Sequence, residues 1–466
     1  MPPALRVLHA IHDYLPRHQA GSEIYVAHLC AALRLAGVQP TVLAAEFDPT
    51  RAHGQLAWRS HDGVPVAEVV NTWQFDRFDG SYRDPALAIA LGHVLDIVQP
   101  HVLHVHNLLN LSFELPALAR ARGIAVAATL HDYTLVCPSG GQRVHRDESH
   151  VCRVIDPTRC ARCFPASPFH AQLRYGQLAR HAPGHALGRL ASAFRRVAPR
   201  ATTAAGAALR RTGATALDAD AIERRLAAAR TAFANFDVAV APSASLAREY
   251  ATLGFPAGRV VVSDYGFAPL ARPPRTPDAD GRLRVGFIGT LVWHKGADVL
   301  IDAAARLPAG RVDVRLFGDP GVFPEYSAAL RTAAHGLPVR FMGRFDHERA
   351  DAIFAQIDVL VVPSRWLENS PLVIHEAFMT GVPVVGSAIG GIVDLLDHGR
   401  HGVLGPPDDP GALAAVLHEL IDRPAQLEEL ARTAPPVKSI EQDAAEWRLR
   451  YATIVGAASA AAVSAS

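Results

Sequence analysis

The sequence of 466 residues lacks the features that would assign it to several common classes of protein. No apolar run reaches the ~18 residues that a membrane-spanning helix requires. Only five cysteines are present, and four of them cluster between Cys137 and Cys163, which argues against a secreted disulfide scaffold. The 46 Lys and Arg residues are balanced by 45 Asp and Glu residues, so the net charge of +1 gives no general attraction to nucleic acid.

A dinucleotide-binding fingerprint is also missing, because the loop after the first expected strand does not read Gly-x-Gly-x-x-Gly. The run from Leu5 to Ala10 is typical of a strand rather than of a secretory signal. We therefore expect a cytoplasmic protein.

The length points to two or three domains, because a single core stops growing at roughly 250–300 residues. Short apolar runs alternate with helical stretches, which predicts an α/β fold with parallel, doubly wound sheets. Expected strands lie near 6–12, 41–45, 102–106, 125–130, 238–241 and 260–263, and in a second series near 284–288, 313–317, 340–342, 359–362 and 384–386.

Two internal matches indicate that the second series repeats the first. Leu5-Arg6-Val7 matches Leu283-Arg284-Val285, and the runs 237–243 and 358–364 share the pattern Asp-Val-x-Val-x-Pro-Ser. We therefore expect two similar domains, each with a strand that ends in Pro-Ser at the equivalent place, and a ligand-binding cleft at the strand ends. The expected boundaries are 1–268 for the first domain, 269–281 for a linker and 282–438 for the second domain.

The stretch 364–378 carries the strongest functional signal. It follows an expected strand and opens a helix, for which Ser370 suits the N-cap and Gly381 the C-terminal end. A helix N-terminus at the carboxyl end of a strand attracts an anion. Glu368 and Glu376 beside it would repel a bare phosphate but accept hydrogen bonds from hydroxyls. The pattern favours a ligand that is anionic in one part and hydroxyl-rich in another, as a nucleotide-sugar is. The alternative is an ordinary strand–loop–helix with two solvated glutamates.

This stretch resembles the donor site of retaining GT-B glycosyltransferases of family four. The match is Glu-x7-Glu at Glu368 and Glu376, then Ala377 and Gly381-Val382-Pro383-Val384. The resemblance implies two Rossmann-like domains facing a cleft, with a C-terminal helix, 440–458, that crosses back onto the first domain. It also implies transfer of a sugar from a UDP- or GDP-sugar to an acceptor hydroxyl with retention of configuration, without a metal or other cofactor.

The resemblance implies a role for each matched residue of this stretch. Glu376 would bind the ribose hydroxyls, and Glu368 would bind sugar hydroxyls and fix the anomeric carbon. The N–H groups of Ser370 and Leu372, the helix dipole and Lys295 would stabilise the diphosphate as it leaves.

A second part of the donor site is expected after the first strand of the second domain. Gly289 and Lys295 match the family pattern Gly-Arg-Leu-x3-Lys-Gly, in which Thr290 takes the place of the usual arginine. A glycine-rich strand end with a nearby ammonium suits a diphosphate. Arg365 or His294 is the candidate for the missing second cation.

In the first domain, the resemblance places the amide of Gly21 near the donor diphosphate, with Ala20 in place of the family's first glycine. Ser22 is expected to cap a helix that ends near Gly37. A plain strand–loop–helix turn is the alternative.

Histidines end two further strands of that domain. The resemblance implies that His131 touches the transferring sugar, although His12-Asp13-Tyr14 repeats the tripeptide that His131 begins. His104 and His106 lie on one face of a strand, because side chains there repeat with period two. Zinc binding without an obvious third ligand is one interpretation of that pair, and lining the cleft is the favoured one.

Four cysteines, Cys137, Cys152, Cys160 and Cys163, could form a structural zinc site. Their spacings of 14, 7 and 2 residues match no standard zinc finger. The alternatives are reduced, partly buried thiols or a redox-labile loop.

A basic helical insertion is expected over 164–235, and its first part, 164–217, contains eight arginines and no acidic residue. Such a segment could lie on an anionic membrane. That interpretation is favoured over a solvated insertion because many family members act on lipid-linked acceptors. The prediction is therefore a cytoplasmic glycosyltransferase of polysaccharide biosynthesis, peripheral on the membrane, that acts on a glycan or lipid-linked acceptor. A nucleotide-sugar epimerase and a non-catalytic sugar-nucleotide binding protein are the alternatives.

Overall fold

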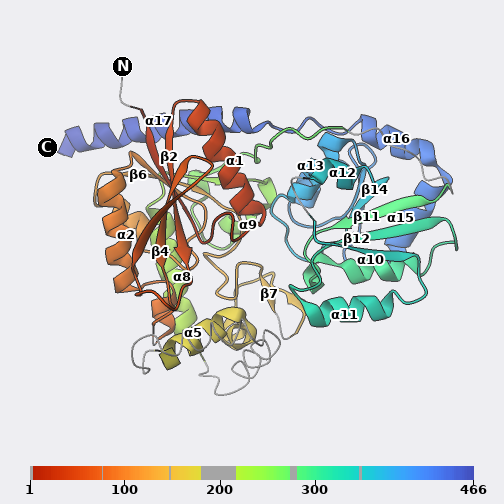
Figure 1. The fold of residues 1–466 in the computed structure, drawn as a ribbon, viewed down its shortest axis with the longest axis horizontal. Coiled ribbons are helices and arrows are strands. Elements are labelled where there is room, and N and C mark those ends of the chain that lie inside the picture. Colours follow the sequence, from red (N-terminus) through yellow and green to blue (C-terminus); the bar gives the residue numbers. More distant parts are fainter. Residues whose placement is uncertain are drawn as a thin grey trace. The chain divides into compact units, whose positions relative to one another are not determined.

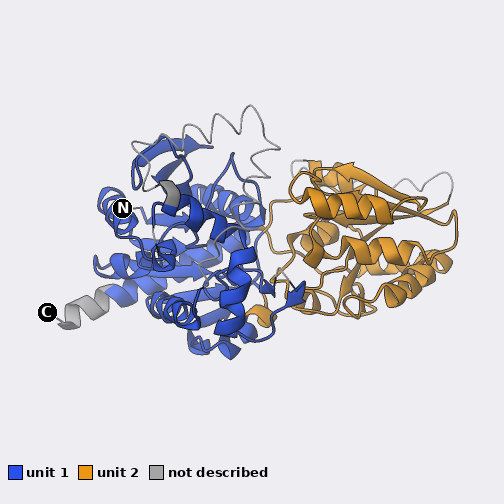
Figure 2. Ribbon diagram, turned by 90° about the horizontal axis from the view of Figure 1, so that it is seen from below, with its two compact units in different colours: residues 1–242, 247–266, 440–466 blue, residues 243–246, 267–439 orange. Residues whose placement is uncertain are grey.

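The computed structural model describes residues 4–75, 77–145, 148–179, 217–272, 281–345 and 349–465. The chain divides into two compact units (Figure 2). Unit 1 comprises residues 1–242, 247–266 and 440–466, and unit 2 comprises 243–246 and 267–439. Of the expected linker 269–281, residues 273–280 lie outside the described residues.

Unit 1 is built on an eight-stranded sheet with the order β10-β9-β6-β5-β1-β2-β4-β3. Its neighbouring strands are all parallel except the pair β3 and β4, which is antiparallel. The strands are β1 (Arg6–Ile11), β2 (Gln39–Glu46), β3 (Leu56–His61), β4 (Val64–Val70), β5 (Val102–Val105), β6 (Ala125–Thr129), β9 (Val238–Ala241) and β10 (Val260–Val262).

The hairpin β3–β4 was not predicted from the sequence. Its turn consists of Asp62 and Gly63, both with positive φ (48° and 76°), which is the backbone that a two-residue hairpin turn requires. β3 escapes detection because it is the edge strand and carries no fully buried residue that would mark one face.

Helices and short elements complete unit 1 (Figure 1). They are α1 (Gly21–Leu35), η1 (Phe78–Ser81), α2 (Pro85–Val98), α3 (Leu115–Arg120), β7 (Val144–His145), β8 (His150–Val151), α4 (Pro157–Cys163), η2 (Phe164–Ala166), α5 (Pro168–Ala179), α8 (Ala219–Ala234), α9 (Ala244–Thr252), which unit 2 shares, η3 (Ala257–Arg259) and α17 (Ile440–Ala465).

The last helix, α17, packs against α1, and the two helices cross (Figure 1). Tyr25 of α1 donates its hydroxyl hydrogen to Asp443 Oδ2 at 2.8 Å and accepts a hydrogen bond from the indole N–H of Trp447 at 3.2 Å. Trp447 and Tyr451 are almost fully buried. α17 is therefore part of the core of unit 1 despite its distance along the chain.

Unit 2 has a six-stranded, wholly parallel sheet with the order β13-β12-β11-β14-β15-β16. Buried Val, Leu and Ala side chains from the sheet and from α10, α11, α15 and α16 form its core. Its elements are β11 (Leu283–Ile288), η4 (Trp293–Lys295), α10 (Ala297–Ala304), β12 (Val312–Phe317), α11 (Pro324–Ala333), β13 (Val339–Gly343), α12 (Ala350–Phe354), β14 (Val359–Val362), α13 (Leu372–Thr380), β15 (Val384–Ser387), α14 (Ile392–Leu395), β16 (Val403–Gly405), α15 (Pro410–Asp422) and α16 (Pro424–Arg432).

Both sheets confirm the predicted α/β class with two Rossmann-like, doubly wound domains. The predicted equivalence of the two Pro-Ser strand ends is wrong. β14 lies directly beside β11, the first strand of its sheet, whereas β9 is separated from β1 by β5 and β6. The shared motif reflects a shared local role instead. Asp237 accepts a hydrogen bond from Val126 N–H of the adjoining strand β6 at 2.8 Å, as Asp358 does from Arg284 N–H of β11 at 2.9 Å.

Candidate functional site

The loop after β14 in unit 2 joins two residues that the sequence singled out. Lys295 Nζ lies 2.7 Å from Glu368 Oε1. The hydroxyl of Ser364, which was not predicted, donates to the same oxygen at 2.6 Å. Glu368 is only 4% exposed, whereas the Lys295 side chain is 29% exposed. A buried carboxylate thus receives two donors, while the ammonium keeps access to solvent and two further N–H bonds.

Glycines allow the surrounding loops to pack this tightly. Gly296, next to Lys295, has φ of 74°, and a Cβ there would stand 2.0 Å from the carbonyl oxygen of Pro363. A Cβ on Gly390 would stand 2.6 Å from the backbone nitrogen and oxygen of Glu368. The loop around Glu368 is therefore held between two glycine contacts, which fixes where its carboxylate points.

Helix α13 begins directly after this loop. Its N-cap position is held by Pro371 without a side-chain cap, so the prediction that Ser370 caps the helix is wrong. The Ser370 hydroxyl instead bonds to His375 Nε2 at 2.9 Å. Leu372 is the first residue of the helix, where N–H groups have no acceptor within the helix. Glu376 lies in the second turn, 8% exposed, and Gly381 ends the helix with φ of 70°, as predicted.

The expected diphosphate loop after β11 differs from the prediction in two respects. The N–H of Gly289 donates to Phe317 O at 3.0 Å, so this amide already has an acceptor. Thr290 is exposed. Arg365, the candidate replacement cation, is paired with Asp298 at 2.7 Å and with Asp408 at 2.6 Å. His294 is buried with its ring edge-on to Trp366. Lys295 is therefore the cation of this loop that reaches solvent next to Glu368.

In unit 1, Gly21 is the first residue of α1, so the loop after β1 leads directly into a helix N-terminus. Ala20 is the N-cap, and Ser22 donates to Glu23 Oε2 at 3.1 Å instead of capping the helix as predicted. Glu23 is buried, and its Oε1 lies 3.4 Å from His12 Nε2. Gly21 can still present its amide at the carboxyl edge of the sheet, but beside a buried carboxylate.

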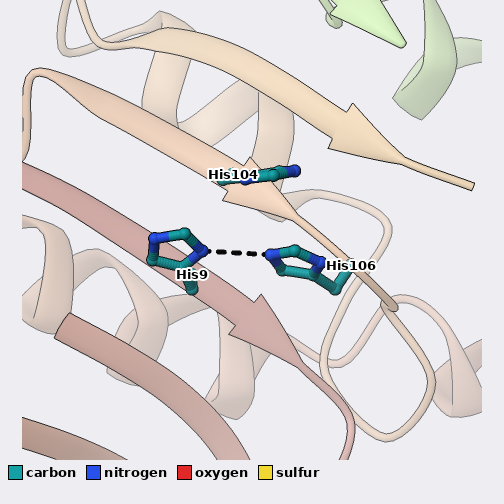
Figure 3. Close-up of side chains that lie close together, drawn as sticks. All are labelled: His9, His104 and His106. Carbon is teal, nitrogen blue, oxygen red and sulfur yellow. Dashed lines mark hydrogen bonds between the residues drawn. The ribbon is translucent and has the colours of Figure 1, made fainter. Parts of the chain in front are cut away.

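His131 is half-buried and belongs to a chain of hydrogen-bonded rings whose other members are buried. Its Nδ1 lies 2.9 Å from the Tyr265 hydroxyl and its Nε2 lies 3.0 Å from His106 Nδ1. His106 Nε2 in turn lies 3.0 Å from His9 Nδ1 (Figure 3). Burial lowers the pKa of His131 and of His9 to about 3, so both imidazoles are neutral at physiological pH. Sequence patterns do not reveal the part played by Tyr265, which is 134 positions away from His131.

The predicted pair His104 and His106 acquires a third neighbour in His9, which lies opposite His104 in the register of β1 and β5. One ring nitrogen from each lies within 4.8 Å of the other two, the spacing of a metal site. However, His104 already bonds to the Tyr451 hydroxyl at 2.7 Å and to Thr129 Oγ1 at 2.8 Å. These partners favour a hydrogen-bonded core network over a metal site.

The four clustered cysteines come from three segments of unit 1, and none of the four is in a disulfide. Burial, and then the nearby thiols of Cys137 and others of the group, raise the pKa of Cys152 to about 11 and of Cys160 to about 12. The thiols therefore lie close enough to influence one another. Within the described residues only the three histidines bring ligand atoms within 4.8 Å, so the sulfurs are spaced more widely than in a closed zinc site.

Of the basic segment 164–217, residues 180–216 lie outside the described residues. The described part consists of η2 and the helix α5. No helix in the described part of the chain has the length and apolarity needed to cross a membrane. The next described helix, α8, is N-capped by Asp218, whose Oδ1 accepts from Ala221 N–H at 2.7 Å.

Comparisons with known proteins agree with this division of the chain. The family model described as glycosyl transferases group 1 matches residues 282–423, and the model described as Glycosyltransferase Family 4 matches residues 20–146. Glycogen synthase of Mycobacterium tuberculosis is 32% identical over 166 residues, or 35% of this chain and 39% of that protein. D-inositol 3-phosphate glycosyltransferase of Corynebacterium urealyticum is 35% identical over 160 residues, or 32% of this chain and 38% of that protein. The chain thus matches about two fifths of the length of these curated relatives.

Solved structures are similar over nearly the whole chain. HepE of Anabaena in complex with UDP and glucose has a TM-score of 0.58 at 17% identity, covering 99% of this chain and 100% of that one. Sucrose-phosphate synthase of Thermosynechococcus elongatus has a TM-score of 0.60 at 17% identity with the same coverage. At this identity the likeness establishes the shared fold.

Proposed function

The chain belongs to the group 1 glycosyltransferases of family four, and on that premise we propose that it moves a sugar from a nucleoside-diphosphate sugar to a hydroxyl of a glycan or lipid-linked acceptor, with retention of configuration. The observation that carries this proposal is the Lys295–Glu368 pair with Ser364, at the carboxyl end of β14 and directly before α13. It provides a cation for a leaving diphosphate beside a carboxylate for sugar hydroxyls.

The geometry supports different roles for the two carboxylate oxygens of Glu368. Lys295 and Ser364 both bond to Oε1, which leaves Oε2 as the oxygen that a donor-sugar hydroxyl would approach. Because the carboxylate is nearly buried, a hydrogen bond to it is stronger than the same bond in water. Glu368 would thereby set the position of the anomeric carbon before the acceptor hydroxyl attacks from the face that the leaving group occupies.

Charge on the leaving diphosphate would be stabilised from two directions. The Lys295 ammonium has two N–H bonds beyond the one directed at Glu368. The N–H groups of Ser370 and Leu372 and the positive end of the α13 dipole would supply the rest. Glu376, one turn further along α13, would bind the ribose hydroxyls. Gly289 would border the diphosphate by its small size, since its N–H is already used.

Unit 1 would contribute two neutral groups to the reaction. The amide of Gly21 would approach the diphosphate, as the family resemblance implies. His131, held neutral by burial, would contact the transferring sugar without adding charge, and a sugar hydroxyl would replace Tyr265 or share His131 with it. None of these steps requires a metal, because Lys295 and the helix N-terminus supply the positive potential.

A nucleotide-release assay tests the proposal. UDP-glucose is the first donor to try, because HepE binds UDP and glucose, and GDP-mannose is the second. We expect nucleotide release that rises with an acceptor panel of oligosaccharides and lipid-linked sugars, and that Glu368→Gln abolishes. Donor conversion without nucleotide release would indicate an epimerase. Donor binding without turnover, with every acceptor tried, would indicate a binding protein. The anomeric configuration of the product, followed by NMR, tests retention.

Membrane association is a separate proposal for the basic segment 164–217, which has eight arginines and no acidic residue. Arginines near an anionic leaflet contribute roughly 1 kcal/mol each, and salt screens that attraction. We expect co-sedimentation with anionic vesicles that decreases with salt and is absent with neutral vesicles. Equal binding to both vesicle types, or to neither, would contradict this proposal without affecting the proposed reaction.

A further inference from the structure

The four clustered cysteines have no part in the proposed reaction, yet they are brought together by otherwise irregular chain. Cys137 ends a turn in which its N–H donates to Tyr133 O at 2.7 Å. Cys152 follows the two-residue strand β8, and Cys160 and Cys163 lie one turn apart on α4. The regular elements of this segment are short, and small segments of this kind are commonly held by a cross-link or a metal.

Contacts between the segments pack the turn, the hairpin and the helix that carry the cysteines against one another. Cys163 Sγ lies 3.9 Å from the carbonyl oxygen of Val144 and 3.6 Å from the hydroxyl of Ser139, two residues after Cys137. Val144 is paired with Val151, the residue before Cys152. His145 Nε2 lies 3.1 Å from Arg159 O, which holds the hairpin β7–β8 against α4. The turn, the hairpin and the helix therefore form one packed segment, and all four cysteines belong to it.

A buried cation lies near this group, and its partners among the described residues are neutral: two carbonyl oxygens and the ring of Phe113, whose centroid is 4.9 Å from the guanidinium carbon. Arg225 of α8 is 5% exposed. It donates to the carbonyl oxygens of Thr134 at 2.6 Å and Leu135 at 3.0 Å, just before Cys137. Among the described residues no carboxylate lies within ion-pair distance of its guanidinium. A buried charge without a counter-charge is costly.

We propose that Cys137, Cys152, Cys160 and Cys163 bind one structural zinc ion, whose four thiolates provide the counter-charge for Arg225. Each thiol loses its proton to solvent, so one Zn²⁺ and four thiols give a centre of net charge −2 and four protons. Four soft thiolate ligands favour zinc in a closed tetrahedral site. Zn–S bonds of about 2.3 Å would hold the four sulfurs closer together than their spacing in this structure.

Metal analysis of the full-length protein, purified without a His-tag, tests the site. We expect about one zinc per chain, and less than ~0.2 in Cys160→Ser. The matched control is Cys30→Ala, which removes the fifth cysteine, in α1, and should keep its zinc. Less than ~0.2 zinc in the wild-type protein would overturn the proposal, as would zinc that Cys160→Ser does not remove or iron with the colour of an iron–sulfur cluster.

Two measurements do not depend on whether the cysteine variants fold. In the wild-type protein, a mercurial that modifies thiols should release the zinc. Before the zinc is released, a thiol reagent should react slowly with the four cysteines, and after its release the reaction should be faster. Arg225→Gln should speed zinc loss to a chelator about 10-fold, because partners outside the ligand shell change metal affinity by roughly 10–100-fold. Arg224→Gln, the exposed neighbour, should not. Equal release rates in the two arginine variants would contradict the counter-charge role.

Discussion

The two units share a strand order around their first strand but differ in how they treat polar groups at the carboxyl edge of the sheet. Unit 1 buries polar rings: His9, His106, His131 and Tyr265 form one continuous chain of hydrogen bonds. Unit 2 keeps opposite charges together, with Lys295 and Glu368 in contact and the ammonium open to solvent. The chain of rings in unit 1 is thus neutral, whereas the Lys295–Glu368 pair of unit 2 is charged.

Burial explains the difference. Removal from water disfavours the charged form of an imidazole, so His9 and His131 stay neutral, and each of them bonds to His106. A carboxylate as buried as Glu368 remains acceptable because a cation and a hydroxyl are placed on it. Unit 1 therefore suits recognition of an uncharged sugar, and unit 2 suits charge that develops on a leaving group.

The largest expected effect is on the stability of unit 1 in acid. The pKa of His9 and of His131 is about 3 in the folded chain and about 6.5 when unfolded, so between these values the unfolded chain binds more protons. Stability is present above pH 6.5 and is lost as the pH falls towards 3. Going from pH 7 to pH 5 should cost roughly 2 kcal/mol for each histidine, or about 4 kcal/mol together.

Chemical denaturation followed by hydrogen exchange, which reports on each unit separately, measures this effect. Unit 1 should unfold at a lower denaturant concentration at pH 5 than at pH 7, and unit 2 should change less. His9→Phe should reduce the stability difference between pH 7 and pH 5 by roughly 2 kcal/mol, the share of one imidazole, while His104, His106 and His131 keep theirs. Equal acid sensitivity of the two units would show that the buried imidazoles do not distinguish them.

The second effect concerns the charged site of unit 2. Lys295→Ala should lower kcat by ~10²-fold or more, equivalent to ~2.7 kcal/mol, because the diphosphate gains charge only as it leaves. Steady-state kinetics with donor varied at saturating acceptor is the measurement. Ser364→Ala is the comparison variant, since it removes the other donor to Glu368 and leaves the cation in place.

A rise in KM at unchanged kcat in Lys295→Ala would make Lys295 a docking residue. Since Arg365 is already paired with Asp298 and Asp408, the leaving-group charge would then have to be stabilised by the N-terminus of α13. Thr290→Arg should be tolerated, because Thr290 is exposed.

Nucleotide affinity should change less. Glu376→Ala removes a carboxylate proposed to bind the ribose hydroxyls, and a charge-assisted hydrogen bond contributes ~1.5–3 kcal/mol, so affinity for UDP or GDP should fall at least ~10-fold. Titration calorimetry with the nucleotide alone isolates this effect from catalysis. Unchanged affinity in a folded variant would remove Glu376 from the donor site.

The smallest expected effect is on kcat/KM, and it distinguishes the two tyrosines that bond to histidines of unit 1. Tyr265→Phe removes the hydroxyl on His131, and Tyr451→Phe removes the hydroxyl on His104. Each should cost about 1 kcal/mol of stability, but only Tyr265→Phe should also lower kcat/KM, by about 5-fold. The same loss of activity in both variants would mean that the network acts on the core and not on the sugar.

Much of this architecture could be predicted because parallel strands buried on both faces appear as continuous apolar runs. β14 was predicted with its observed bounds for that reason. The edge strand β3 was missed because it lacks a buried face. The cap at Ser370 was wrong because His375, five residues later, takes the hydroxyl. Ser364, Tyr265 and His9 were missed because their roles come from contacts that only the folded chain creates.

The return of α17 to unit 1 has a consequence for how the protein is made. Tyr25 and His104 leave the ribosome early, but their partners Asp443, Trp447 and Tyr451 are translated only after all of unit 2. At about 5–20 residues per second, translating residues 267–439 takes on the order of ten to forty seconds. During that time unit 1 is incomplete, whereas unit 2 can already fold. The nascent chain therefore exposes the α1 face that α17 will cover, which makes this face a target for chaperones and for premature association between chains.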